Sequence, residues 1–204
     1  MEGTLSSAEP ADGITRGRLL LAGAAAAAAA VATGSRRGEG TGLAAASAAT
    51  DAEILNFFLT LEYAQAAFYR QAVESERLGG ELLAPATAFA RQEEEHARVL
   101  VGHLGGRARP RPRPVELDDV VASPEAFRRT AIDLEEAVIA GYVGQAGHLS
   151  HRALGDVATI LSVEARQVAW LRDLDGVSPA PRAADPARTA EDVLDELRGK
   201  GLLA

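Results

Sequence analysis

The sequence contains no cysteine, few aromatic residues and a single lysine, and these shortages narrow the classes of protein it can encode. Without cysteine there is no disulfide framework, no thiolate nucleophile and no metal site built on cysteine sulfur. No Gly-x-Ser-x-Gly motif is present either, so nothing supports a serine or cysteine hydrolase. Aromatic residues make up 4% of the chain, and we therefore expect an aliphatic, alanine-rich core of closely packed helices.

The chain also has fewer basic residues than acidic ones, 21 against 29, which gives a formal net charge of -8. This excludes the broad cationic surface on which a nucleic-acid partner would bind, so we expect no such partner. The remaining composition, 47% apolar and 25% charged over 204 residues, is typical of a globular protein with one core of ordinary size.

Residues 1–48 resemble an export signal and linker. Arg16 and Arg18 precede an apolar stretch at 19–32 that is mostly leucine and alanine, and small residues follow it. The pattern is similar to a twin-arginine signal, although a glycine separates the two arginines. The stretch is too short for a membrane span, so we expect an exported protein of the periplasm, cell envelope or extracellular space. A retained N-terminal anchor and a disordered tail are the alternatives.

Apolar periodicity and capping signals predict an all-α domain over residues 50–176. The first helix is expected to open with a capping box at Thr50, and the third to begin at Ser123. Gly141, Gly144 and Gly147 in the third helix are expected to permit close backbone contact. The four helices are predicted to span about 50–78, 85–105, 123–148 and 152–175, with a tail at 177–204 that carries a short helix capped by Thr189.

The connection between the second and third helices, residues 105–123, is unusually long. Its alternating arginines and prolines favour an extended, semi-rigid chain that can span the length of a helix. Such a connection returns the chain to the other end of the domain, as a four-helix bundle with one long crossover requires. The arginines could also form a nucleic-acid patch, but they lack interleaved aromatic residues, so we interpret the segment as a linker.

Each predicted helix places one carboxylate within its apolar stripe, where it points toward the axis of the bundle. Buried carboxylates are costly unless shared protons, buried arginines such as Arg91, Arg98 or Arg166, or metal ions compensate them. One glutamate from each of two helices, with Glu-x-x-His from each of the other two, is the pattern of a two-metal carboxylate site. Carboxylates and imidazole suit iron or manganese. The candidate metal ligands are Glu62, Glu93, His96, Glu135, Glu164 and Gln167.

An internal repeat strengthens the metal hypothesis. The segment from Leu61-Glu62 to Tyr69 returns as Leu134-Glu135 to Tyr142, with alanines at matching positions. The pair Glu93 and His96 returns as Glu164 and Gln167. Two helical hairpins related by a pseudo-twofold axis would produce this repeat, with the site close to the axis.

These segments, over about Thr50 to Gly176, resemble the ferritin-like superfamily, and especially its exported bacterial branch related to desiccation-associated proteins. The resemblance implies a ferritin-like four-helix bundle that binds iron or manganese at the glutamates and His96. It implies oxidation of ferrous iron or dismutation of peroxide as the chemistry. Tyr69 and Tyr142 match positions beside the ligands.

The sequence departs from this family at Gln167, where a second histidine is expected. An amide oxygen is a weaker ligand than imidazole, so we expect one tight site near His96 and a second that is weak, empty or completed by water. The departure leaves two hypotheses open. One is a metal protein that handles dioxygen or peroxide; the other is a non-catalytic envelope or stress-related bundle with a degenerate site.

Overall fold

The computed structural model describes residues 48–119 and 121–204, and within these ranges it contains helices and no strand. Residues 1–47, on which the export prediction rests, lie outside the described residues. No helix in the described part of the chain is long and apolar enough to span a membrane. The elements are α2 (Ala48–Glu74), α3 (Leu83–Leu104), the 3-10 helix η1 (Gly105–Arg107), α4 (Pro124–Ala146), α5 (His151–Leu174) and α6 (Ala190–Gly199).

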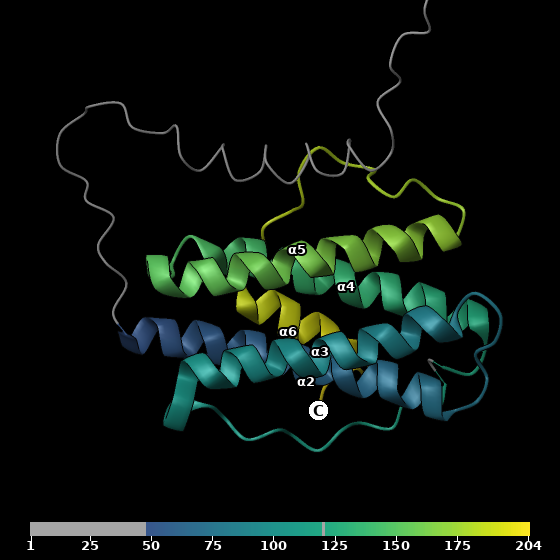
Figure 1. Cartoon of the computed structure of the whole chain (residues 1–204), viewed down its shortest axis with the longest axis horizontal. Helices are drawn as coiled ribbons and strands as arrows, with labels where there is room; N and C mark the ends of the chain where they lie inside the picture. Colours follow the sequence, from purple (N-terminus) through teal and green to yellow (C-terminus); the bar gives the residue numbers. More distant parts are fainter. Residues whose placement is uncertain (1–47, 120) are drawn as a thin grey trace, which may run out of the picture. The chain divides into compact units, whose positions relative to one another are not determined.

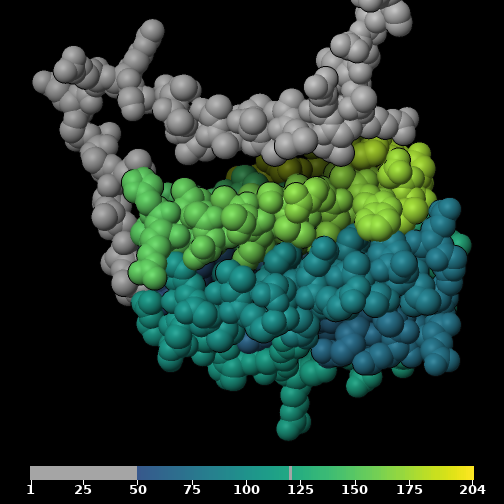
Figure 2. Space-filling model, in the orientation of Figure 1, coloured from purple at the N-terminus to yellow at the C-terminus, as the bar shows by residue number. Residues whose placement is uncertain are grey.

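Four of these helices form two hairpins, as the repeat predicts (Figure 1). Helix α2 packs on α3, and α4 packs on α5. The hairpins meet through contacts of α2 with α4 and of α3 with α5. In Figure 2 the surfaces of α3 and α5 meet along one face of the bundle. The predicted all-α bundle with one long crossover is confirmed.

Serine and threonine side chains cap three of the helices, as their sequence positions indicate. Ser123, Ser150 and Thr189 each accept a hydrogen bond from a backbone N–H in the first turn of α4, α5 and α6. The capping box predicted at Thr50 is wrong, because α2 begins earlier, at Ala48. Asp51 instead accepts hydrogen bonds from the backbone N–H and hydroxyl of Ser150, so it joins the start of α2 to the start of α5.

Two amide side chains of α2 hold the long crossover against that helix. Asn56 Oδ1 accepts from the Arg109 backbone N–H at 2.7 Å, and its Nδ2 donates to the Arg107 carbonyl. Gln71, four turns further on, accepts from the Leu117 N–H at 3.1 Å. The chain after α3 therefore runs the length of α2 before it enters α4 (Figure 1). Between these points the Arg111 guanidinium lies 4.4 Å from the ring centroid of Tyr63.

The few aromatic residues are concentrated in the core, which the prediction of an aliphatic interior did not anticipate. All five phenylalanines are buried. The rings of Phe58 and Tyr142 stack with centroids 3.9 Å apart, and those of Phe68 and Phe127 stack at 5.5 Å. These contacts join α2 to α4 and set the spacing of the two helices that carry Glu62 and Glu135.

The three glycines of the third predicted helix have different roles. A Cβ on Gly144 would lie 1.9 Å from the carbonyl oxygen of Arg188, and a Cβ on Gly141 would lie 3.0 Å from the Phe57 ring. Gly147 follows the last residue of α4 and has open space around it, so the expectation of close contact is wrong there. The Arg188 N–H donates to the Ala140 carbonyl at 3.0 Å, and this contact seats α6 on α4 through Val193 and Leu197.

Gly144→Ala is expected to displace the segment around Arg188 and lower the free energy of unfolding by about 1–3 kcal/mol, because the added methyl group overlaps backbone that cannot move alone. Urea unfolding of the variant measures this change. Gly147→Ala, at an open position with φ of -67°, is the matched control and is expected to change stability little. Equal effects of the two substitutions would contradict the close contact at Gly144.

Candidate metal centre

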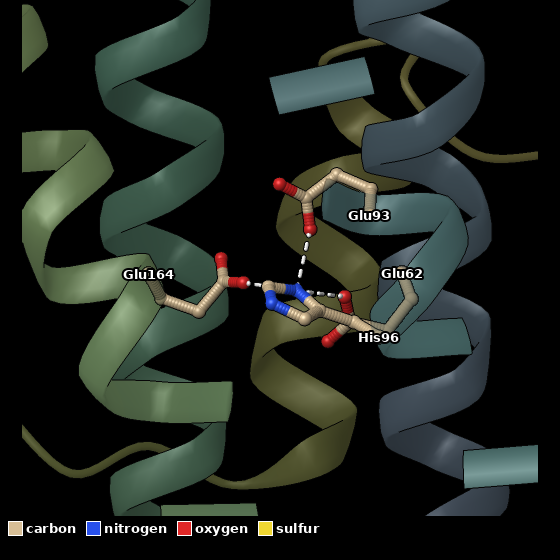
Figure 3. A group of neighbouring side chains, drawn as sticks. All are labelled: Glu62, Glu93, His96 and Glu164. Atoms are coloured by element: carbon tan, nitrogen blue, oxygen red, sulfur yellow. Dashed lines mark hydrogen bonds and ion pairs between the residues drawn. The ribbon is translucent and has the colours of Figure 1, made fainter. Parts of the chain in front are cut away.

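Three helices bring one imidazole and three carboxylates together in the core (Figure 3). Glu62 comes from α2, Glu93 and His96 from α3, and Glu164 from α5. One potential ligand atom from each of the four residues lies within 4.8 Å of the others. The carboxylates have no exposed surface, and His96 is 7% exposed. The i, i+3 spacing of Glu93 and His96 places both on the same face of α3.

The three carboxylates converge on a single nitrogen. Nδ1 of His96 lies 3.2 Å from Glu62 Oε2, 3.0 Å from Glu93 Oε2 and 2.9 Å from Glu164 Oε1. One N–H cannot donate well to three acceptors, and Glu164 Oε1 has no hydrogen-bond donor despite this proximity. A buried carboxylate oxygen without a donor is costly, so this donor set fits a bound cation.

A protein donor holds the other oxygen of each carboxylate. Tyr142 donates its hydroxyl to Glu62 Oε1. Gln167 Nε2 donates to Glu93 Oε1 at 2.7 Å, and Gln65 Nε2 donates to Glu164 Oε2 at 2.7 Å. Each carboxylate is thus fixed by one oxygen and directs the second toward His96, which orients the ligand set before any ion binds.

The structure places the other two predicted ligands beside this cluster. Glu135 on α4 accepts from the Tyr69 hydroxyl at one oxygen and from Gln65 Nε2, at 2.9 Å, at the other. Gln167 directs its amide nitrogen toward Glu93, and its amide oxygen has no donor. The four ligand atoms that converge therefore belong to Glu62, Glu93, His96 and Glu164, while Glu135 and Gln167 lie in the adjoining half of the core.

Buried arginines do not compensate these carboxylates, so that alternative is wrong within the described residues. Arg91, Arg98 and Arg166 are exposed. Arg172 is buried, but it donates to Glu136, which is outside the cluster. His96 is the group that can carry positive charge among the clustered carboxylates.

The pKa values follow from this crowding. Burial raises the pKa of Glu62, Glu93 and Glu135 above the ordinary value, and the charge of Glu164 raises each of them further. Burial by itself lowers the pKa of His96, but the close approach of the three carboxylates to its Nδ1 and the charge of Glu62 outweigh it and raise that pKa to about 12. Without a metal, the site therefore retains protons to offset its negative charge.

Gln65 is the functional residue that the sequence-based prediction missed. It lies in the apolar stripe of α2 one turn after Glu62, and it is fully buried. Its position among apolar residues was the available signal, but an amide in a stripe is equally compatible with a hydrogen bond to backbone. Only the packing of α2 against α4 and α5 brings it between Glu135 and Glu164.

A four-helix bundle with one long crossover and carboxylates and histidine in its core defines the ferritin-like class of helical proteins. Residues 50–176 match the ferritin-like domain family, and the chain belongs to this family. Its buried glutamate and histidine cluster could hold a metal ion. Comparison with curated proteins returns no significant match.

Metal-free protein is expected to lose stability as the pH rises from about 5 to 8. The raised glutamate pKa values mean that the folded state binds more protons than the unfolded state above about pH 4.5, and the raised His96 pKa adds to this difference above about pH 6.5. Each such proton contributes a slope of about 1.4 kcal/mol per pH unit. Urea unfolding of chelator-treated protein measures the slope. Glu93→Gln should reduce it and Glu95→Gln, on the exposed face of α3, should leave it unchanged; a stability that rises with pH would contradict the prediction.

Proposed function

We propose that this protein binds iron or manganese at Glu62, Glu93, His96 and Glu164. The observation that supports this most strongly is the convergence of three carboxylate oxygens on one imidazole nitrogen in a core with little access to water. Hard oxygen ligands with one imidazole favour these metals over copper, and zinc would fit less well. Membership of the ferritin-like family supports the same conclusion.

We further propose that the bound metal handles dioxygen or peroxide. An iron or manganese ion would supply redox chemistry toward such an oxidant. The chain's own residues hold and orient the ligands: the Tyr142 hydroxyl positions Glu62, and the Gln167 amide positions Glu93. The three ligand carboxylates have no exposed surface, and this burial excludes bulk water and strengthens the electrostatic interactions within the site.

We also propose that the protein is exported and belongs to the desiccation-related branch of the superfamily. The support for export is the arginine pair and apolar stretch within residues 1–48. A reporter fused to these residues is expected to leave the cytoplasm. Replacing Arg16 and Arg18 with lysine should retain it there if the route is the twin-arginine one. Export that is unaffected by these replacements would argue against that route.

A second candidate function is a non-catalytic, stress-related envelope protein with a degenerate metal site. The observation that favours it is the presence of two amides, Gln65 and Gln167, against the buried carboxylates. Replacing Glu62 and Glu135 with leucine separates the candidates. A degenerate core should become more stable, because apolar packing often outperforms buried charge, whereas a working site should lose metal and metal-dependent stability.

Mn²⁺ or anaerobic Fe²⁺ is expected to raise the melting temperature of the chelator-treated full chain. Binding at one hundred times the dissociation constant adds about 2.7 kcal/mol to the free energy of unfolding, which corresponds to several degrees. Differential scanning calorimetry and elemental analysis of the desalted protein measure the effect. His96→Leu should abolish it, and the matched control Glu95→Gln, an exposed carboxylate one residue earlier, should preserve it. No metal-dependent shift in the unsubstituted protein would refute the proposed metal site.

A further inference from the structure

The two hairpins repeat each other closely at the site, but the polar side chains differ at two buried positions. Glu62 corresponds to Glu135, and Glu93 corresponds to Glu164. The tyrosines are reciprocal: Tyr142 of α4 donates to Glu62 of α2, and Tyr69 of α2 donates to Glu135 of α4. The differences are His96 against Gln167, and Gln65 against Val138, which lies three residues after Glu135 and is also fully buried.

The Gln65 amide bridges two carboxylates in the half of the core that lacks histidine. Its Nε2 lies 2.9 Å from Glu135 Oε2 and 2.7 Å from Glu164 Oε2. An amide NH₂ group has two hydrogens, so it can supply one to each carboxylate. A cation between the same two carboxylates would need the space that this NH₂ group fills.

The side-chain amide of Gln167, like that of Gln65, directs its nitrogen toward a carboxylate. Its nitrogen contacts Glu93 Oε1 and, at 3.0 Å, the Gln92 side-chain oxygen. The amide oxygens of Gln65 and Gln167 are both buried without a donor, so the carboxylates' need for donors determines how the amides are oriented. Either amide would have to turn around to offer its oxygen to a metal ion.

The two halves therefore differ in how well protein donors satisfy their carboxylate oxygens. Around Gln65, both oxygens of Glu135 and Oε2 of Glu164 each accept a hydrogen bond from a protein donor. Around His96, three carboxylate oxygens compete for a single nitrogen. Around Gln65, protein donors already occupy the carboxylate oxygens that a metal ion would use. Around His96, the carboxylate oxygens point at one another's common neighbour and are arranged as metal ligands would be.

We propose that the Gln65 side-chain amide takes the place of a second cation, so that the chain holds one divalent ion in a fold whose symmetry would accommodate two. This inference rests on the proposed metal site at His96. On this proposal the second site is absent for two reasons. Gln65 fills the space between Glu135 and Glu164, and Gln167 stands where a histidine ligand is expected. The pseudo-twofold relation supplies the substitutions that would reverse it, Gln65→Val and Gln167→His.

The test counts Mn²⁺ bound to the chelator-treated full chain and to three variants, by elemental analysis after gel filtration and by electron paramagnetic resonance. We expect one ion in the unsubstituted protein, one in Gln167→His, and two, with an exchange-coupled signal, in the double variant Gln65→Val/Gln167→His. Gln65→Val alone should stay near one, because the second half still lacks imidazole. Far-ultraviolet circular dichroism confirms that each variant retains its helices.

Three results would overturn the inference and leave the proposed metal site standing. They are two ions in the unsubstituted protein, two ions in Gln167→His alone, and one ion in a folded double variant. No bound ion in the unsubstituted protein would instead refute the proposed function, and this inference with it. The outcomes thus distinguish the two failures.

A measurement on the unsubstituted protein covers the case in which the double variant does not fold. The Gln65 side-chain NH₂ resonances, assigned by their loss in Gln65→Glu, should remain protected from solvent exchange after the protein is loaded with diamagnetic Zn²⁺, whose binding elemental analysis verifies. Persistence of these signals supports an amide that stays between Glu135 and Glu164. Loss of their protection on loading would show that the amide moves aside, and would overturn the inference.

Discussion

Three carboxylate oxygens share one imidazole nitrogen in a buried part of this bundle, and this shortage of positive charge is the constraint on which the site depends. Water cannot solvate these groups, so protons or a cation must compensate them. The raised pKa values of Glu62, Glu93 and His96 describe the first solution, and the converging donor set fits the second. The two solutions exclude each other at the same atoms, which couples the protonation of the core to its occupancy by metal.

The fold supplies the rigidity that such a site needs. Stacked rings of Phe58 and Tyr142 fix α2 against α4, and the same tyrosine then orients Glu62. Asn56 and Gln71 hold the crossover along α2, so α4 begins at the far end of the bundle from the end of α3. From there α4 brings Glu135 to the Gln65 side chain. Helix packing and the path of the crossover therefore help to set the distances among the carboxylates.

The asymmetry of the site connects the fold to the proposed function. Ferritin-like domains place carboxylates symmetrically about the bundle axis, and this chain keeps all four carboxylates. Two glutamines change what the second half can do, because an amide donates hydrogen bonds to carboxylates without adding charge. The half around His96 keeps the carboxylates and imidazole of a metal site, and the half around Gln65 has amides where a second site would need ligands.

The sequence by itself determined the helices, the long crossover, the family and the acidic residues of the core. Apolar periodicity, capping residues and the repeat are patterns that can be read along the chain without knowledge of its folding. It placed Thr50 wrongly as a cap and Gly147 wrongly at a close contact, since both depend on where a helix starts or what packs nearby. Only the tertiary structure decided that Glu62, Glu93, His96 and Glu164 converge while Gln65 bridges Glu135 and Glu164. Which polar atoms meet in a core depends on helix rotation and side-chain direction across three or four helices, and no spacing within a single helix specifies that.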